Sequence, residues 1–498
     1  MSSCQVRRIA VLAAFAIVAI AAALAPRTAT AQFVCDSTTP GGADGATATG
    51  TGSVACGTNA TAVGDGSIAI GNGAGAGADP ANSENTAVGN GAGQDVDGFD
   101  NTAIGRDSGI FVTGGNNTAN GSFSGQSVTG FNNTASGAFS GRFVTGGSNS
   151  AFGQSAGQEV TGDDNTAIGR SSGDNVEGNS NTAIGSFSGL NVVGDDNTAS
   201  GSGAGGTVAG DGNTASGRLS GANVTGDSNT ASGDSSGRNV AGSDNAASGS
   251  LSGNDVNGDL NAAYGTRSGS NVTGSANTAG GHSSGVNVNG NFNTAYGTQS
   301  GQNVTGDNNI AIGLNAGNNV AVNNSIAIGT NATASANGTA IGTGATASAD
   351  GSAAFGNGAV ATRTNQQAFG TANNTYTFAG LNSAASLAAQ SGPLSVVTTD
   401  ANGNLAAAPF SSLGVASVED LDRANAGVAM AFAMAGAPTV LPGENHVATI
   451  NWGAFEGQNA LALAGATRIS NNLQFNAGIA FGLNDGGVGG RAGLRFSW

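Results

Sequence analysis

A 16-residue unit that repeats without a slip from Asn85 limits the folds open to this chain. Its pattern is N-T-A-[I/S/Y]-G-x-x-S-G-x-x-V-T-G-x-x, and fourteen full units are followed by the start of a fifteenth at Asn309. A fixed period of this length is typical of a solenoid in which every unit forms one coil. A single unit cannot bury its own apolar face, so we expect coils stacked about 4.8 Å apart.

The residues of the unit indicate how one coil is built. N-T-A forms a short extended stretch, the glycines at positions 5, 9 and 14 make the tight corners, and the valine at position 12 supplies the interior. Shorter units of 13 or 14 residues flank the array, beginning at Gly66 on one side and at Asn324 on the other. We therefore predict solenoid repeats over residues 66–363, with the 16-residue units at 85–323.

The composition excludes an ordinary globular core. The 498 residues include 88 glycines, with 5% aromatic and 9% charged side chains. A chain of this kind is either disordered or a repeat structure that buries small residues in register. The strict period favours the repeat structure, and the fold class is predicted to be mainly β.

Residues 1–31 resemble a secretory signal. Arg7 and Arg8 precede an apolar run, and Ala29-Thr30-Ala31 offers small residues for cleavage. The alternative is a retained membrane helix, although 17 apolar residues are at the short limit for a span. Export would place Cys35 and Cys56, in a predicted N-terminal tip at 32–65, in an oxidising compartment, where they either form a disulfide or remain free thiols.

The charge and the polar residues argue against several functions. The chain has no lysine, and without residues 1–31 its 11 arginines and 31 acidic residues give a formal charge of −20. Such a chain would repel nucleic acid. The two histidines, His282 and His446, are isolated, and the paired aspartates at 162–165 and 194–197 are expected to be turn residues. We predict no enzymatic activity and no cofactor, with a Ca²⁺ site in the acidic turns as a minor alternative.

Residues 442–498 predict a membrane anchor of four β-strands. Apolar residues alternate with small or polar ones in segments of about 10 residues, as in outer-membrane barrels. The smallest such barrels have about 8 strands, so this chain must combine its strands with those of other copies. The residues predicted to face lipid are Ile450, Trp452, Leu461, Leu463, Phe475, Ile479, Leu494, Phe496 and Trp498.

A short helix is predicted before these strands, within 415–441, after a connector at 364–414. Its apolar spacing gives a coiled-coil seam with one polar position. Two copies would make an 8-stranded barrel filled by side chains, whereas three would make 12 strands around a space for three helices. The alanine- and glycine-rich inner face favours the trimer; the alternative is an ordinary helix outside the barrel. The predicted seam residues are Val418, Leu421, Asn425, Val428 and Phe432.

The order of repeats, helix and strands resembles the trimeric autotransporter adhesins, the YadA-like family. The resemblance is carried by SIAIG and TAIG coils and by the segment from AGVAMAFAMAG to GGVGGRAGLRFSW. It implies a left-handed parallel β-roll head built by three chains, a stalk, and a 12-stranded barrel in the outer membrane. It also implies that the anchor supports export of its own passenger with the cell's barrel-assembly machinery. Two departures are the 16-residue coil, longer than usual for the family, and the short stalk.

The expected function is attachment. As a homotrimer at the surface of a Gram-negative bacterium, the protein would bind matrix proteins, host cells, surfaces or other bacteria through many weak contacts. The alternative is a passive surface coat or a self-aggregation protein without a specific ligand. Phe99, Phe111, Phe131 and Phe292 lie at variable positions, where they either form binding surfaces or connect successive coils.

Overall fold

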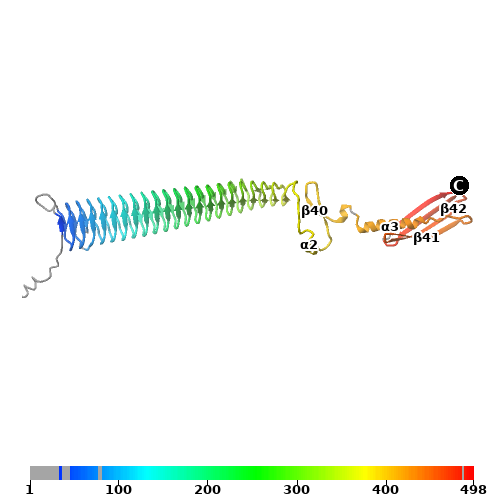
Figure 1. Ribbon diagram of the computed structural model, residues 1–498, viewed down its shortest axis with the longest axis horizontal. Helices are drawn as coiled ribbons and strands as arrows, with labels where there is room; N and C mark the ends of the chain where they lie inside the picture. The colour runs from blue at the N-terminus through cyan, green and yellow to red at the C-terminus, as the bar shows by residue number, and fades with distance from the viewer. Residues whose placement is uncertain (1–32, 36–44, 77–80, 415, 485–486) are drawn as a thin grey trace, which may run out of the picture. The chain divides into compact units, whose positions relative to one another are not determined.

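The computed structural model describes residues 33–35, 45–76, 81–414, 416–484 and 487–498. The predicted signal at 1–31 lies outside these residues. The chain divides into two compact units, Met1–Asn374 and Thr375–Trp498. The first is a parallel β-solenoid and the second carries a helix and an antiparallel sheet (Figure 1).

Two long parallel sheets run along the solenoid, one formed by positions 2–4 of each unit and the other by positions 12–13. The 22-stranded sheet contains β1 (Phe33–Cys35), β3 (Val54–Cys56), β5 (Ile68–Ile70), β7 (Thr86–Val88), β8 (Thr102–Ile104), β9 (Thr118–Asn120), β10 (Thr134–Ser136), β11 (Ser150–Phe152), β13 (Thr166–Ile168), β15 (Thr182–Ile184), β17 (Thr198–Ser200), β19 (Thr214–Ser216), β21 (Thr230–Ser232), β23 (Ala246–Ser248), β25 (Ala262–Tyr264), β27 (Thr278–Gly280), β29 (Thr294–Tyr296), β31 (Ile310–Ile312), β32 (Ile326–Ile328), β34 (Thr339–Ile341), β36 (Ala353–Phe355) and β38 (Gln367–Phe369).

The second sheet has ten strands, and two three-stranded sheets continue the same side at the ends. The ten strands are β12 (Val160–Thr161), β14 (Val176–Glu177), β16 (Val192–Val193), β18 (Val208–Ala209), β20 (Val224–Thr225), β22 (Val240–Ala241), β24 (Val256–Asn257), β26 (Val272–Thr273), β28 (Val288–Asn289) and β30 (Val304–Thr305). The end sheets contain β2 (Thr47–Ala48), β4 (Thr61–Ala62) and β6 (Gly75–Ala76), and β33 (Thr333–Ala334), β35 (Thr346–Ala347) and β37 (Val360–Ala361).

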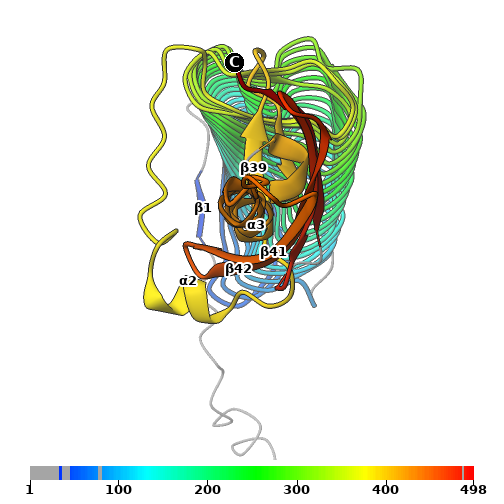
Figure 2. The same cartoon turned by 90° about the vertical axis from the view of Figure 1, so that its right-hand side faces the viewer.

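Within the array, equivalent residues of neighbouring coils pair with each other. Ala199 is the partner of Ala215 in the first sheet, and Val192 is the partner of Val208 in the second. The predicted period is therefore the length of one coil. Viewed along the solenoid, the coils superpose on one flattened outline (Figure 2).

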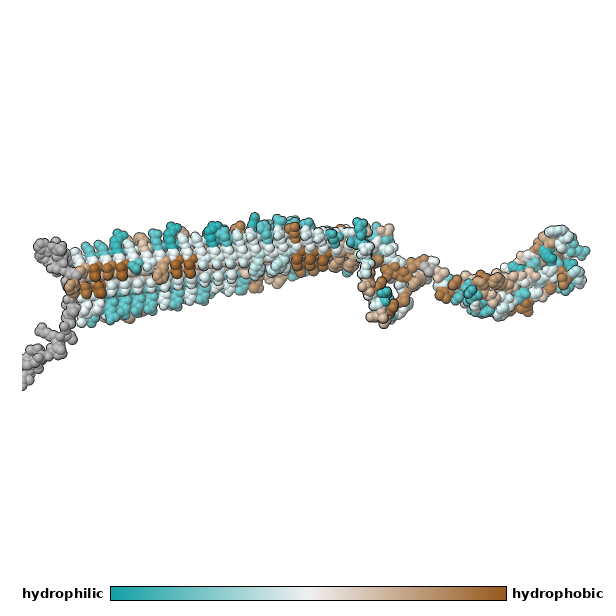
Figure 3. Space-filling view, viewed as in Figure 1, coloured by the Kyte–Doolittle hydropathy of each residue, from teal (hydrophilic) through white to brown (hydrophobic). Residues whose placement is uncertain are grey.

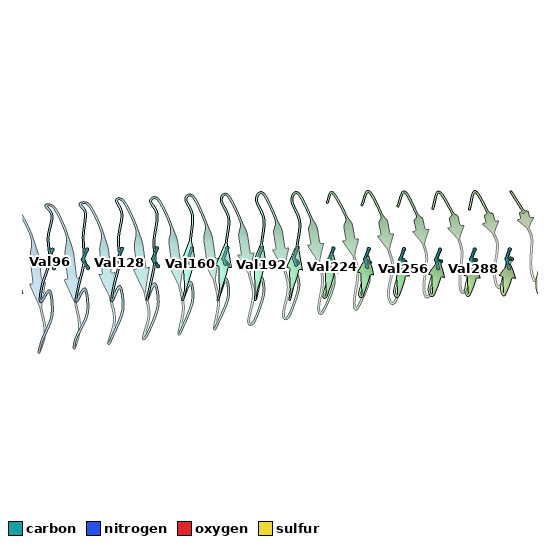
Figure 4. Close-up of a cluster of buried hydrophobic side chains, with 14 of the residues drawn as sticks. Val96, Val128, Val160, Val192, Val224, Val256 and Val288 are labelled. Carbon is teal, nitrogen blue, oxygen red and sulfur yellow. The ribbon is translucent and has the colours of Figure 1, made fainter. Parts of the chain in front are cut away.

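The interior is a column of valines facing a column of alanines. The valine at position 12 is 2–7% exposed in every coil of the array and packs on its equivalents (Figure 4). The alanine at position 3 lies on the opposite wall, and the 16-residue coils leave a narrow cavity of about 90 Å³ between the walls. The column contains Val96, Val112, Val128, Val144, Val160, Val176, Val192, Val208, Val224, Val240, Val256, Val272, Val288, Val304 and Val320.

The asparagine at position 1 forms a buried ladder of side-chain hydrogen bonds. The Asn213 side-chain oxygen accepts from the backbone N–H and the side-chain amide of Asn229, each at 3.0 Å. The Asn213 amide donates to Asn197 at 3.0 Å and to the Gly226 carbonyl at 2.9 Å. Each rung thus satisfies polar groups of two coils, as buried polar groups require.

The glycine corners are required by both conformation and space. Gly217 has φ +125°, and a Cβ there would lie 2.5 Å from the carbonyl oxygen of Gly233 in the next coil. Backbone therefore meets backbone at this corner, which only glycine permits.

The solenoid extends beyond the predicted limits of 66–363. It already includes β1 and β3, and it continues to β38, which pairs with β36. The predicted N-terminal tip therefore contributes strands to the sheet, and a coil follows Arg363. The first coil departs from the period, because β1 and β3 are 21 residues apart. The coil after Arg363 keeps the 14-residue spacing of the coil before it, but Gln366 and Gln367 stand where that coil has Ser352 and Ala353.

The second unit begins with a short helix, α2 (Ala384–Ala388), and an antiparallel hairpin of β39 (Val396–Thr399) and β40 (Leu405–Ala408). The predicted Asn402-Gly403 turn connects the hairpin strands. A 3₁₀ helix, η1 (Phe410–Leu413), precedes α3 (Val418–Ala435). Within the described residues, no helix has the length and apolar character needed to cross a membrane.

A four-stranded antiparallel sheet completes this unit. Its strands are β41 (His446–Phe455), β42 (Gln458–Ser470), β43 (Leu473–Gly482) and β44 (Val488–Phe496), paired in that order. The four predicted strands are therefore present as one sheet.

The asparagine ladder gives a first prediction. Asn213→Ala removes four hydrogen bonds from a buried site, and we expect the local unfolding free energy to fall by roughly 1–3 kcal/mol. Hydrogen exchange of the full-length protein should show faster exchange around residues 197–229. Thr225→Ala, on the exposed side of the ten-stranded sheet, is the matched control. Equal exchange in both variants would contradict a stabilising ladder.

Candidate functional site

The helix α3 lies in the concave side of the β41–β44 sheet (Figure 2). Its start is fixed by a capping box, in which the Ser417 hydroxyl accepts from the Asp420 backbone N–H at 3.0 Å. The helix therefore begins three residues after the predicted start. The contact itself is made by alanines that are fully buried: Ala429, Ala433, Ala460, Ala462 and Ala480.

Small residues set the distance between helix and sheet. A Cβ at Gly453 would lie 2.2 Å from the carbonyl oxygen of Ala429, so no larger residue fits at this point of β41. The Phe432 ring packs edge-on against Phe455 at a centroid distance of 5.8 Å. A single sheet of four strands thus already holds its own helix against its inner face.

The predicted lipid-facing residues of the strands lie on the other side of the sheet. Ile450 and Trp452 alternate with the small inner residues and are 71% and 61% exposed. Leu461 and Leu463 face out in the same way between Ala460, Ala462 and Ala464. Contact of this face with lipid stays a prediction.

Most of the predicted seam lies on the face of α3 that the sheet leaves uncovered, whereas Phe432 contacts Phe455 of β41. Val418 and Leu421 are 76% and 57% exposed, and Val428 and Phe432 are also exposed. Asn425 is half-buried. The helix therefore has two faces, an alanine face against its own sheet and an exposed row of Val418, Leu421 and Val428, with Phe432 at the margin against Phe455 of β41. The seam's role in assembly stays a prediction.

In the solenoid, position 4 of the unit forms an exposed apolar column on the outer face of the 22-stranded sheet. It is interrupted at Asn120, Ser136 and Gly280 and by serines from Ser200 to Ser248, and apolar side chains correspondingly gather in separate tracts along this unit in Figure 3. The exposed apolar members are Ile70, Ile104, Phe152, Ile168, Ile184, Tyr264, Tyr296, Ile312 and Ile341.

The two edges of the coil, which connect the two sheets, carry different charges. We call positions 5–11 the arginine edge and positions 14–16 the acidic edge. In residues 101–316 all six arginines lie on the arginine edge: Arg106, Arg142, Arg170, Arg218, Arg238 and Arg267. Nine aspartates and no basic residue lie on the acidic edge: Asp163, Asp164, Asp195, Asp196, Asp211, Asp227, Asp244, Asp259 and Asp307.

The arginine edge also holds phenylalanines in an unfavourable conformation. Arg106 lies 4.4 Å from the ring centre of Phe123, which stacks on Phe139 at 5.1 Å. Residues at these corner positions have φ near +60°, which costs a bulky side chain about 1–2 kcal/mol. Most other coils place serine, asparagine or aspartate there. The phenylalanines with positive φ on this edge are Phe111, Phe123, Phe139, Phe143 and Phe187.

The acidic edge is a ladder between coils. An Asp163 side-chain oxygen accepts from the Gly147 backbone N–H at 2.7 Å, and Asp227 accepts from Asp211 at 2.9 Å. These aspartates therefore bond to the preceding coil, whereas the sequence had suggested bonds within their own turn. On the arginine edge, burial and then the nearby Glu159 raise the pKa of Asp174.

The four phenylalanines singled out in the sequence are exposed by about half or more. Phe111 lies on the arginine edge, whereas Phe99, Phe131 and Phe292 lie on the acidic edge. Stacking between coils occurs at Phe123 and Phe139 instead. Cys56 is disulfide-bonded, and β1 places Cys35 beside it in register, so the Cys35–Cys56 bridge stays a prediction that the register supports.

Comparison with known families agrees with this architecture. The family described as YadA-like membrane anchor domain matches residues 438–498. The family described as YadA head domain repeat matches residues 48–74, 323–339 and 336–359. No curated protein shows a significant match to the chain. The residues matched by the head repeat lie in the solenoid, and those matched by the anchor domain include β41–β44.

The match to the YadA-like membrane anchor at residues 438–498 implies a protein of the outer membrane and cell surface. With its YadA-like head repeats and YadA membrane anchor domain, the chain belongs to the trimeric autotransporter adhesin family. Members of this family are not enzymes. Among the residues that the structure describes, no group of three or more metal-ligating side chains is found.

The helix–sheet contact gives a prediction for the anchor. Gly453→Val places two methyl groups where the α3 backbone lies, and overpacking of this kind costs about 1–3 kcal/mol or more. We expect several-fold less trimer that resists SDS without boiling. Gly465→Val is the control, because a Cβ there has no neighbour closer than 3.6 Å. Equal loss in both variants would contradict the role of this contact.

The raised pKa of Asp174 gives a prediction for pH. A carboxyl with a raised pKa in the folded state binds its proton more tightly than in the unfolded chain, so its ionisation destabilises the head as pH rises. We expect Asp174→Asn to raise the melting temperature at pH 7, with the difference shrinking as pH falls to 4. Asp211→Asn serves as the comparison. A difference that grows toward acid pH would contradict the assignment.

Proposed function

We propose that this protein attaches the cell to matrix proteins, other cells or surfaces through many weak contacts along its head. The observation that carries this proposal is the outer face of the ten-stranded sheet. Each coil presents one exposed side chain at position 13, in register with the next coil. Thr225 and Thr273 are examples, with Ala241 and Asn257 in the coils between them.

Regular spacing makes weak contacts additive. A ligand that binds one coil is held near the next, so the second contact forms at a high effective concentration. Linked contacts of this kind raise the overall affinity by about 10²–10⁴-fold. Trimerisation of the anchor, which the family implies, multiplies the array by three.

The anchor also supports a specific assembly. We propose that three sheets join into a 12-stranded barrel, with Ile450 and Trp452 facing lipid and three α3 helices inside. The exposed row of Val418, Leu421 and Val428 would then meet the same row on the other two helices. Alanines at the helix–sheet contact leave the space that three helices need.

Export follows from the same arrangement. We propose that residues 1–31 direct the chain across the inner membrane, and that the anchor, inserted with the barrel-assembly machinery, supports passage of the head to the surface. In this account the signal is cleaved, and a Cys35–Cys56 bond closes the first coils after export.

A passive coat or a self-aggregation protein is the second candidate. The acidic edge favours the passive coat over self-aggregation, because nine aspartates without a basic residue keep neighbouring molecules apart and hydrated. A coat needs no specific contact, so its behaviour should not depend steeply on the number of coils. This difference separates the two candidates experimentally.

The experiment is excision of four whole units, residues 197–260. The deletion keeps the phase of the coil, because Asn261 then occupies the position of Asn197. For an adhesin we expect attachment of expressing cells to coated surfaces to fall by roughly tenfold or more. Attachment in proportion to head length or unchanged would favour the coat.

A matched control keeps the length of the head. Replacing the exposed Thr225, Thr273 and Thr305 by serine retains the hydroxyls and the coil number, and it should leave attachment close to that of the wild type. The unboiled trimer band is measured in all variants, so that loss of surface trimer is not mistaken for loss of binding.

A further inference from the structure

We propose that the arginine edge of each head lies against the acidic edge of the neighbouring chain in the trimer, so that the three heads form a closed ring of complementary edges. This inference rests on the trimer in the proposed function, and it goes beyond it by naming which surfaces meet. The partner of each edge is a second copy of this chain.

The charge distribution of the array provides the first argument. Between residues 101 and 316 the arginine edge carries six arginines and five acidic residues, whereas the acidic edge carries nine aspartates. The two edges connect the same two sheets from opposite sides of the coil, so they face in opposite directions. Contact between two acidic edges would place many like charges side by side, which is unfavourable in an interface.

Symmetry provides the second argument. Three parallel heads related by a three-fold axis meet through two different surfaces of each head, and three such contacts close a ring. Where one sheet of each head faces the axis, those two surfaces are its two edges. The apolar column at position 4, with Ile168 and Ile184 as examples, then faces the axis. The same rotation that buries this column brings each arginine edge to an acidic one.

The strained phenylalanines provide the third argument. Phe111 and Phe143 have positive φ and are 60% and 48% exposed, so neither backbone preference nor burial within one chain explains them. Strain of this kind persists where a contact requires it. A neighbouring chain would cover these rings and the Arg142 guanidinium, which lies 4.9 Å from the ring centre of Phe143.

The level of each charge along the solenoid identifies pairs to test. Arg218 is at position 6 of the coil that begins at Asn213, and Asp211 and Asp227 are the acidic residues just before and at the end of that coil. Within one chain Arg218 is paired with Asp234, 2.9 Å away on the same edge. In the ring, Arg218 of one chain would lie at the level of Asp211 and Asp227 of the next.

Cysteine crosslinking of the full-length protein in cells tests the ring. The two double variants are Arg218→Cys with Asp227→Cys and Arg218→Cys with Asp211→Cys, and the three single variants are their controls. After oxidation, samples are boiled in SDS without reductant, so that only covalent links hold chains together. We expect two- and three-chain species from at least one double variant and none from the single variants or the wild type.

Two results would overturn the proposal. Covalent dimers from Asp227→Cys or Asp211→Cys alone would show that acidic edges meet each other. Absence of crosslinks from both double variants, with the unboiled trimer band and surface delivery intact, would show that the edges do not meet. Because the unboiled band reports the anchor separately, failure of the trimer itself is distinguished from failure of the edge contact.

Discussion

The structure of the head depends on one constraint, the in-register stacking of equivalent residues in successive coils. Backbone pairing at one coil spacing requires that each side chain tolerate its own copy as its neighbour. Asparagine does so by hydrogen bonding to the next asparagine, and valine and alanine do so by packing in columns. Once this register is fixed, a substitution in one coil changes the contacts of the equivalent residues in the coils before and after it. Each column of equivalent residues therefore has its own chemistry, polar, apolar or charged. The solenoid is therefore a set of parallel columns rather than a core surrounded by a surface.

The anchor depends on small residues at the contact between its helix and its sheet. A four-stranded sheet cannot close on itself, and its inner face must still hold a helix. Gly453 and the buried alanines allow α3 to lie directly on the strands, while the apolar row of the helix points away from them. A chain folded in this way exposes apolar surface on both the helix and the outer side of the sheet. Assembly with further copies, in a membrane, satisfies both.

Much of the fold could be predicted from the sequence, because the spacing of residue types reflects the length of each coil and strand. The coil length, the glycine corners and the interior valine follow from spacing alone, and the alternation from Glu444 to Trp498 predicts the strands of the anchor. Hydrogen bonds between residues 16 apart, such as Asn197 to Asn213, could not be predicted without the register of the sheet. The strand β1 was missed because it lies 21 residues before β3, and β38 was missed because Gln366 and Gln367 stand where the coil before it has Ser352 and Ala353. The alanine face of α3 was not predicted, because an alanine fits equally well against a sheet and toward the inside of a barrel. The hydrogen-bond partners of the aspartates were not predicted, because they lie in the neighbouring coil.

The central claim is that three chains share one anchor. Its most direct test is the apparent mass of the protein in purified outer membranes, compared between unboiled and boiled samples in SDS. We expect an unboiled band at about three times the chain mass that collapses to the monomer on boiling, as for a barrel built from three sheets of four strands. A monomer in both samples would contradict the shared barrel, and with it the trimeric head.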